Sequence, residues 1–360
     1  MKRNAVLLLL CLTLMLPGCA GQNHSPYSKY TYEFLGAFDT VIQFMGYAKN
    51  QEAFEEMVQI GQNRFAELHK LFDIYYDYEG INNIKTINDN AGIKPVEVSQ
   101  EIIDLIVFSK EWYHKTNGKC NIALGPVLAI WHDYREAGSA NPEAAELPPM
   151  ESLREASKYT DIDKVSVDEE KKTVYLEDEH MRLDVGAVAK GFASEIVTKE
   201  LEAKGYTSFI VSSGGNVRTS GKPLNGARTK WGIGLQNPDG NPNDPNDPPI
   251  DIAFLMDQSM VTSGDYQRYY MVNGKKYHHL IDPETLMPAD YFRAVTIITK
   301  DSGLADFMST TIFLTPFEEG LQLAESLGIE AVWIMGDGTI RATGNAKNML
   351  KNLGGAKNTE

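Results

Sequence analysis

Basic residues, cysteines and long apolar runs are all scarce in this 360-residue chain. Lys and Arg number 34 against 49 Asp and Glu, so the formal net charge is −15. Charge-driven binding to nucleic acid or to an anionic membrane surface needs clustered basic residues, and both are therefore disfavoured. The three cysteines form no CxxC pair, and no HExxH or GxGxxG motif occurs. These absences exclude the common zinc sites and the common dinucleotide-binding fold.

One long apolar run stands at the N-terminus. Lys2 and Arg3 precede an apolar stretch over residues 5–16, and "LPGC" follows it. This is the pattern of a secretory signal, and the run is too short for a comfortable transmembrane helix. The ending resembles the lipobox of bacterial lipoproteins. It predicts a signal peptide over 1–18, a lipidated Cys19 with palmitate among its acyl chains, and a polar tether over 19–30.

Lipidation would anchor the protein to the cell membrane on its extracytoplasmic face. The alternative is an ordinary signal peptide with an incidental cysteine. With Cys11 removed and Cys19 acylated, Cys120 is the only thiol left, so we expect no internal disulfide and a domain held together by its core alone.

Hydrophobic periodicity predicts an α+β fold. Apolar residues recur at helical spacing over 51–72 and 100–116, the second ending at Asn117-Gly118. Short apolar runs at 165–167 and 173–176 predict a hairpin. Further helices are expected at 191–204 and 302–314, and further strands at 208–213, 231–236, 252–256, 259–264, 294–299, 331–335 and 340–343.

Composition predicts two loops, at 137–149 and 237–251, because both segments are rich in Pro, Asn, Asp, Ala or Gly. The second lacks the Gly and Glu positions of an EF-hand calcium loop. No repeat or linker divides the chain. One domain is therefore predicted over 31–350, followed by a tail over 351–360.

The stretch "RLDVGAVAKGF" at 182–192 places a carboxylate, small residues and an ammonium close together. It is expected to be a strand ending at Asp184, a turn through Gly186 and Ala187, and a helix start behind Lys190. Such a stretch suits a phosphorylated ligand, a metal ion, or a tight turn with charged edges.

Asp306 and Thr310 are four residues apart on a predicted helix, so their side chains share one face. A carboxylate and a hydroxyl form a hard oxygen pair that suits Mg²⁺. The alternative is ordinary polarity on a helix surface. His278 and His279 are adjacent, so on a strand at most one of them faces any site. They form either a turn with one surface and one buried histidine, or a site with a general base.

Taken together and in order, these motifs resemble the ApbE family of FAD:protein FMN transferases. The matching segments are "GAFDTVIQF", "IKTIN", "GKCNIALGPVLAIW", "DVGAVAKGFA", "SSGGNV", "TSGDYQRYY", "HHLIDPETLMP" and "LADFMSTTIF". The resemblance covers nearly the whole mature chain. It implies an α+β fold of mixed or antiparallel sheets packed with helices, with an FAD cleft between two lobes. It also implies Mg²⁺-dependent (or Mn²⁺-dependent) transfer of the FMN half of FAD to a Thr or Ser hydroxyl, with release of AMP.

The resemblance also assigns roles to individual residues. Ala187, through its backbone carbonyl, Asp306 and Thr310 would hold the metal. The residues that would contact FAD are Phe38, Tyr78, Lys119, Cys120, Asn121, Asp184, Lys190 and Leu280, with His279 beside them. Phe38 stands where the family commonly has Met, and Lys119-Cys120-Asn121 lacks the carboxylate of the family's Ala-Phe-Asp triplet. Tyr78, rather than Tyr75 or Tyr76, follows from counting back from Asn88.

His279 is expected to be the base that activates the acceptor hydroxyl, with Asp282 as its orienting partner. The implied partners are FAD, the membrane, and a membrane or secreted redox protein that carries the acceptor hydroxyl. Two other functions remain open: an FAD pyrophosphatase that yields FMN and AMP, and a lipid-anchored protein that binds FAD without turnover.

Overall fold

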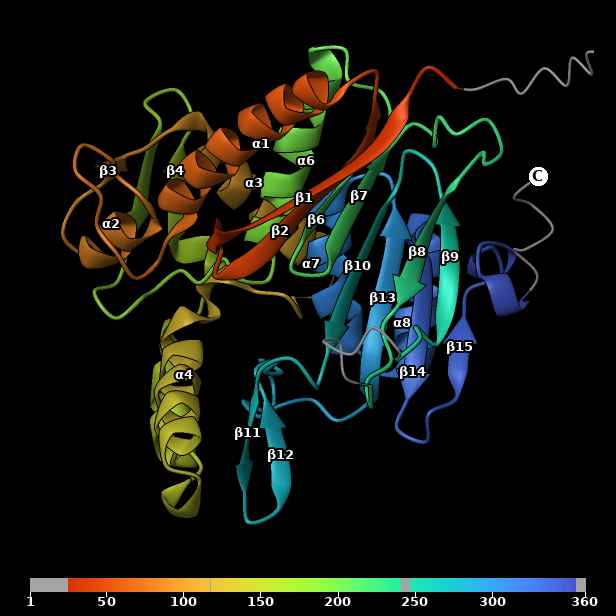
Figure 1. The fold of residues 1–360 in the computed structure, drawn as a ribbon. Coiled ribbons are helices and arrows are strands. Elements are labelled where there is room, and N and C mark those ends of the chain that lie inside the picture. The colour runs from red at the N-terminus through yellow and green to blue at the C-terminus, as the bar shows by residue number, and fades with distance from the viewer. Residues whose placement is uncertain (1–24, 117, 241–246, 354–360) are drawn as a thin grey trace, which may run out of the picture.

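The computed structural model describes residues 25–116, 118–240 and 247–353. Within these ranges helices and antiparallel strands follow one another without regular alternation, which confirms the α+β prediction (Figure 1). The predicted signal peptide, Cys19, Asn117 and most of the C-terminal tail lie outside the described residues. No helix within the described ranges is both long enough and apolar enough to span a membrane.

A large antiparallel sheet forms the centre of the molecule. In the described residues it has eight strands, each hydrogen-bonded to its neighbours in antiparallel fashion. In spatial order they are β1 (Ser28–Ala37), β2 (Thr40–Ala48), β6 (Phe209–Ser213), β7 (Asn216–Ser220), β10 (Ser259–Gly264), β13 (Phe292–Thr299), β14 (Glu330–Met335) and β15 (Ile340–Ala342).

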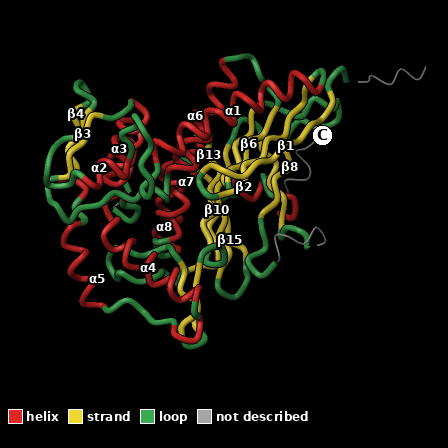
Figure 2. The backbone as a smooth tube through the Cα atoms, turned by 60° about the vertical axis from the view of Figure 1, so that its left-hand side comes forward, coloured by secondary structure: helices red, strands yellow, loops and turns green. Residues whose placement is uncertain are grey.

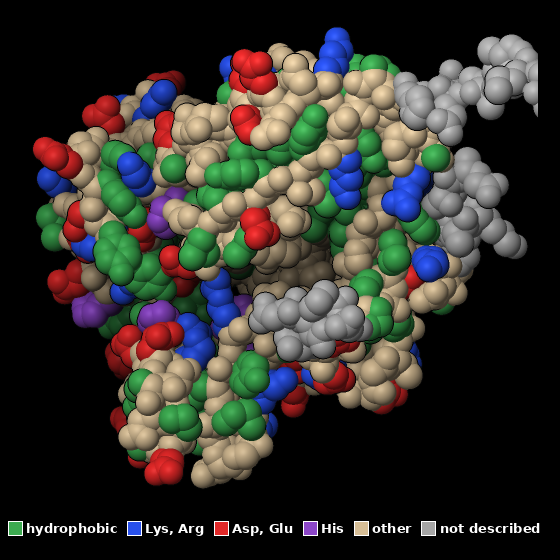
Figure 3. Space-filling model, in the orientation of Figure 1, with side chains coloured by type: hydrophobic (Ala, Val, Ile, Leu, Met, Phe, Trp, Pro, Cys, Tyr) green, Lys and Arg blue, Asp and Glu red, His purple; other side chains and the backbone are tan. Residues whose placement is uncertain are grey.

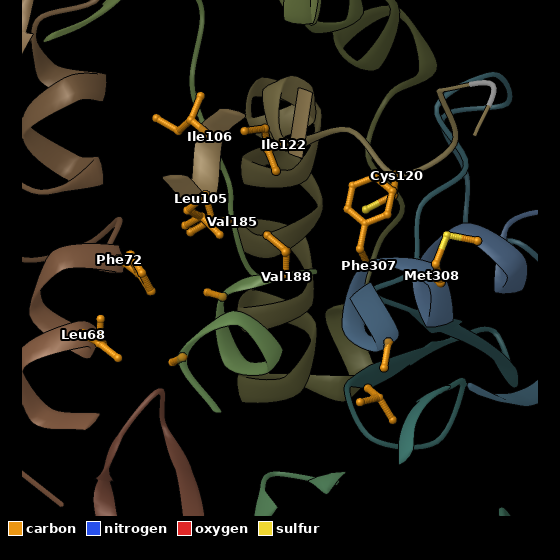
Figure 4. Close-up of a cluster of buried hydrophobic side chains, with 14 of the residues drawn as sticks. Leu68, Phe72, Leu105, Ile106, Cys120, Ile122, Val185, Val188, Phe307 and Met308 are labelled. Atoms are coloured by element: carbon orange, nitrogen blue, oxygen red, sulfur yellow. The ribbon is translucent and has the colours of Figure 1, made fainter. Parts of the chain in front are cut away.

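Helices cover one face of this sheet and build the main core. They are α1 (Gln51–Phe72), α3 (Gln100–Lys115), α6 (Ala189–Ala203), α7 (Ser302–Phe313) and α8 (Phe317–Leu327). Figure 4 shows part of this core, where Leu68 and Phe72 of α1 lie near Leu105 and Ile106 of α3. Strand side chains alternate between the faces, so on β6 Phe209 and Val211 belong to this core.

Two strands cover the opposite face. Hairpin β8 (Trp231–Leu235) and β9 (Asp251–Leu255) packs there, and Ile210 of β6 belongs to the second core beneath it. A third, smaller sheet has the order β3 (Val96–Glu97), β5 (Thr173–Leu176) and β4 (Val165–Asp168), and α2 (Ile84–Asp89) lies beside β5.

A small lobe projects from this main body (Figures 1 and 2). It contains α4 (Gly125–Ala140), α5 (Met150–Ala156) and the hairpin of β11 (Tyr269–Val272) and β12 (Lys275–His278). Its own apolar core includes Trp131, Leu153 and Tyr270. The described residues also contain short 3₁₀ helices, at Ile122–Leu124, Pro142–Ala144, Ser157–Tyr159, Ile162–Lys164, Ala346–Asn348 and Lys351–Leu353.

Two local predictions are wrong. The predicted loop at 137–149 begins inside α4, which continues to Ala140 before Pro142 ends helical hydrogen bonding. The segment before Asp184 is extended but is not a strand. It is held by a side chain instead: Asn88 donates to the Leu183 carbonyl at 3.0 Å and accepts its N–H at 2.7 Å.

Candidate active site

A cleft of about 470 Å³ lies where the small lobe meets the main body. Lys, Arg and His side chains border the hollow between the lobes in Figure 3. Its lining includes most residues singled out in the sequence: Phe38, Lys119, Cys120, Asn121, Asp184, Ala187, Lys190, His279, Leu280, Asp306 and Thr310. These residues are far apart in the chain, and the fold brings them to one place. Their individual roles stay predictions.

The turn after Asp184 forms one wall of the cleft. Asp184 accepts the Gly186 N–H at 2.9 Å, which fixes a turn directly before α6. Lys190, in the first turn of α6, donates to the Gly186 carbonyl at 3.2 Å. Its ammonium nitrogen also lies 3.9 Å from the Asp306 carboxylate. The three features noted in the sequence, turn, carboxylate and ammonium, therefore belong to one arrangement.

Gly191 allows α6 and α7 to cross closely. A Cβ atom at this position would lie 2.3 Å from the Ser302 carbonyl oxygen and 2.4 Å from the Asp306 Cβ, so only glycine fits without a shift. The close approach also lets the Gly191 N–H donate to Asp306 Oδ2 at 2.8 Å. The glycine is thus required by helix packing rather than by a ligand.

Asp306 is buried, with 4% of its surface exposed. Burial raises the pKa of this carboxyl, and the nearby Lys190 ammonium opposes the shift. Thr310, one turn along α7, places its hydroxyl oxygen 3.4 Å from that of Ser263. The described residues contain no group of three His, Cys, Asp or Glu side chains placed to hold a metal ion. A metal here would have one carboxylate, one hydroxyl and backbone carbonyl oxygen as ligands. That donor set fits Mg²⁺, which keeps several waters.

The two adjacent histidines have different surroundings. His278 is buried; its Nε2–H donates to the Ala289 carbonyl at 2.7 Å and its Nδ1 accepts the Leu280 N–H at 3.2 Å. Both ring nitrogens are therefore occupied, and burial lowers the pKa of His278. This histidine is structural, and it leaves His279 as the one that lines the cleft.

His279 is oriented by the backbone of Arg268. Its backbone N–H donates to the Arg268 carbonyl at 3.1 Å, and its Nδ1 lies 3.3 Å from the same oxygen. Because a carbonyl only accepts, Nδ1 carries the ring proton and Nε2 keeps a free lone pair. Burial in the cleft wall, with repulsion from Arg268 next in importance, lowers the pKa of His279 to about 3. The ring is therefore neutral at pH 7.

Asp282 is not the orienting partner that the sequence suggested. Its carboxylate lies 3.3 Å from the Lys119 ammonium and accepts the Glu284 N–H at 2.9 Å. Lys119 also pairs with Glu284 at 2.9 Å. Lys119 therefore forms ion pairs with two carboxylates of the turn after His279. Asp282 contacts Lys119 and the backbone of this turn rather than the His279 ring.

Tyr78 also differs from its predicted place. It does not line the cleft, and its hydroxyl donates to Asp73 at 2.7 Å. Tyr75, three residues earlier, lines the cleft and has 46% of its surface exposed. Counting along the sequence could not separate the two, because a bend held by Asp73 turns the chain between them: Asp73 accepts the backbone N–H groups of Tyr75 and Tyr76.

Sequence reasoning missed Arg135 and Arg268, which also line the cleft. Arg135 lies on the same face of α4 as Leu128, Trp131 and His132, a spacing that could have identified it. Arg268 stands immediately before β11, within the family-matching segment "TSGDYQRYY", but the sequence analysis assigned it no role.

The chain is similar to known proteins in both sequence and structure. A profile of the ApbE family matches residues 38–333. An FAD:protein FMN transferase from Klebsiella pneumoniae is 30% identical over 274 residues, covering 74% of this chain and 81% of that protein. One from Treponema pallidum is 29% identical and covers 75% of each chain.

Solved structures agree with the fold. The ApbE protein from Thermotoga maritima superposes with a TM-score of 0.77 at 26% identity, over 89% of this chain and 99% of that one. The flavinyl transferase ApbE from Pseudomonas stutzeri gives 0.73 at 22% identity, over 90% and 97% of the two chains. The family profile spans most of the chain and includes every residue of the cleft discussed above. The chain belongs to the ApbE family.

Proposed function

We propose that this protein transfers the FMN half of FAD to a Thr or Ser hydroxyl of a target protein and releases AMP. The observation that carries the proposal is the convergence of Asp306, Lys190 and His279 in one cleft. A cation-binding carboxylate, an ammonium and a neutral base are the groups that cleavage of a diphosphate by a hydroxyl requires. The names of the relatives support the same reaction.

The cleft suits a dinucleotide in size and in lining. Its volume of about 470 Å³ lies within the usual range for small-molecule sites. Phe38, Phe72 and Tyr75 are aromatic residues of the lining that suit a flavin or adenine ring, and Asp306 and Lys190 are charged residues of the same lining. The same cleft can therefore hold both the rings and the charged bridge of FAD.

Asp306, Thr310 and the Ala187 carbonyl would hold the metal ion. When bound, Mg²⁺ would neutralise charge on the diphosphate and on the leaving AMP. Lys190 lies close enough to Asp306 to share this task. Its hydrogen bond to the Gly186 carbonyl keeps the ammonium at the start of α6.

His279 would accept the proton of the acceptor hydroxyl. The hydroxyl oxygen forms a bond to the phosphorus of the FMN half, and the bond from that phosphorus to the bridging oxygen breaks. AMP leaves with the bridging oxygen, and the hydroxyl proton moves to Nε2 of His279. Because Nδ1 is held by the Arg268 carbonyl, Nε2 is the ring nitrogen available for that proton.

Anchoring at the membrane is part of the proposal. The N-terminal "LPGC" supports lipidation at Cys19, and the acceptor would then be a membrane or secreted redox protein. Water in place of the acceptor hydroxyl would make the protein an FAD pyrophosphatase, and absence of turnover would make it an FAD carrier.

One experiment separates these functions. The chain without residues 1–19 is mixed with FAD, Mg²⁺ and a candidate acceptor, and both in-gel flavin fluorescence and AMP are measured. Labelled acceptor with an equal amount of AMP is expected. AMP without labelled protein would identify a hydrolase, and neither product would identify a binding protein. Asp306→Ala should abolish either activity.

A further inference from the structure

Arg135 and Arg268 face the cleft without acidic partners. Arg64, Arg218 and Arg293 each contact a carboxylate at 3.0 Å or less. Among the described residues, neither Arg135 nor Arg268 has a carboxylate within ion-pair distance; Arg135 donates to His132 Nδ1 at 2.9 Å instead. In a chain with a net charge of −15, two unpaired guanidinium groups in one cleft indicate an anionic ligand.

The two groups also repel each other. Burial lowers the pKa of Arg135, and the positive charge of Arg268 lowers it further, against the opposing effect of Glu136 and Asp184. Both arginines belong to the small lobe, because Arg135 is on α4 and Arg268 leads into β11, which packs on α4. Two cations that repel each other in the empty cleft cost stability, and a ligand with two negative charges would remove that cost.

We propose that Arg135 and Arg268 form the receptor for the diphosphate of the dinucleotide substrate. This assignment rests on the proposed function. It adds a second group of positive charges to the first, which consists of Lys190 and the metal ion that Asp306 would hold. Guanidinium groups suit phosphate oxygens because their donors form a planar fork, and charge-assisted bonds of this kind are about twice as strong as neutral ones. The receptor would bind the diphosphate from the small lobe, while Asp306 and Lys190 belong to the main body.

Occupancy of this receptor has a consequence for His279. Arg268 and Arg135 both lower the pKa of His279, together with burial and His278. The other titratable or charged groups in this part of the molecule are His132, which contacts both Arg135 and the Tyr75 ring, together with Tyr75, Asp184, Glu136 and Arg182. A bound diphosphate would offset the two guanidinium charges, so the pKa of His279 should rise when FAD binds. His279 would then be a weak base in the empty cleft and a stronger one in the complex.

The receptor can be tested without measuring flavin transfer. The full-length chain in detergent is titrated with ADP and with adenosine, which differ in the diphosphate alone. Wild type should bind ADP at least tenfold more tightly than adenosine. Arg135→Met and Arg268→Met should each weaken ADP binding about tenfold and leave adenosine binding unchanged, whereas Arg135→Lys should retain part of the preference. Arg154→Met, on the exposed side of α5 in the same lobe, is the control.

Equal loss of ADP and adenosine binding in both Met variants, or no loss in either, would overturn the receptor. If the ADP preference depends on the arginines but wild type transfers no flavin, the receptor stands and the proposed function fails. A second readout uses turnover: in wild type the acid limb of kcat should lie at higher pH than that of kcat/KM, because the first reports the complex and the second the free enzyme. The double Met variant should move the acid limb of kcat/KM to higher pH, because the free enzyme then lacks the two charges that lower the pKa of His279. An acid limb at the wild-type pH would contradict the coupling to His279.

Discussion

His279 is held by the Arg268 carbonyl, and this choice of partner shapes its chemistry. A carboxylate partner would stabilise the protonated ring and raise its pKa, as in catalytic triads, whereas a carbonyl fixes the tautomer with little added charge. Burial and the nearby guanidinium groups lower the pKa of His279, so the ring is neutral in the empty cleft. The proposed base is therefore oriented by the backbone, and a bound diphosphate would raise its pKa.

Replacement of His279 tests its role at this scale. His279→Gln should lower kcat by about 10²–10⁴ while FAD binding changes by no more than a few fold, because Gln can still donate to the Arg268 carbonyl but cannot accept the proton. Single-turnover flavin transfer and FAD fluorescence titration measure the two quantities. His114→Gln, at an exposed histidine paired with Asp163, should behave as wild type. A His279→Gln protein with wild-type kcat would remove His279 from the mechanism.

The sequence located some residues of the cleft and not others, for a physical reason. Asp306 and Thr310 share a helix face, and Lys190 is four residues from Gly186. Spacing along the chain was therefore enough to predict that these residues lie close together. Tyr75 and Arg268 reach the cleft through a bend at Asp73 and through the junction of two lobes. The bend at Asp73 is local, but no periodic pattern marks it. The place of Arg268 depends on the packing of β11 against α4, and these two elements are far apart in the chain.

At the scale of elements, the crossing of α6 and α7 fixes the position of the Asp306 carboxylate in the cleft. Gly191→Ala should destabilise the protein by about 1–3 kcal/mol, since the added methyl group would overlap the Ser302 carbonyl and the Asp306 Cβ. It should also displace Asp306, so activity should fall by more than stability alone explains. Thermal unfolding and flavin transfer at a temperature well below the transition measure both effects.

Gly336→Ala is the matched control for Gly191→Ala. A Cβ atom at Gly336 would have no neighbour within 4 Å, so both measurements should stay near those of wild type. Equal stability and activity in Gly191→Ala and Gly336→Ala would show that the helix crossing tolerates a methyl group and that its spacing does not set the position of Asp306.

Elements were predictable where periodicity was strong. The helix at 51–72 was predicted with both its boundaries, because one apolar stripe runs its full length. The structure adds the cap: the Asn50 side chain accepts the Ala53 N–H. The hairpin of β1 and β2 was missed although Tyr30, Tyr32 and Phe34 alternate on β1, because most of this strand is exposed and Leu35 interrupts the alternation. Residues 182–184 read as a strand because a turn and a helix start follow them. In the structure Leu183 pairs with the Asn88 side chain and the Asp184 N–H donates to the Ile122 carbonyl, and the sequence reveals neither contact.

At the scale of the whole molecule, the site is divided between two bodies with separate cores. His279 and both arginines belong to the small lobe or its junction, while Asp306 and Lys190 belong to the main body. The described chain begins at Ser25, whose hydroxyl donates to the Leu224 carbonyl of the main body. Tethering at the N-terminus would therefore act on the main body and leave the small lobe unattached.

Substitution of Cys19 tests the proposed anchor. Cys19→Ser should move the protein from the detergent phase to the aqueous phase in a Triton X-114 partition and abolish labelling by radioactive palmitate. Flavin transfer to a soluble acceptor should be unchanged, because all residues that line the cleft belong to the described domain. A wild-type protein in the aqueous phase would mean that the N-terminus is an ordinary signal peptide.

The N–H of Gly191 belongs both to the helix crossing and to the Asp306 carboxylate, and this shared atom limits how the protein can vary. A change anywhere along α6 or α7 that slides one helix over the other alters the hydrogen bond to a proposed metal ligand. Thermal robustness and reaction rate can therefore not be tuned independently at this crossing. Efforts to stabilise the protein should begin at surfaces far from it, such as the outer hairpin of β8 and β9.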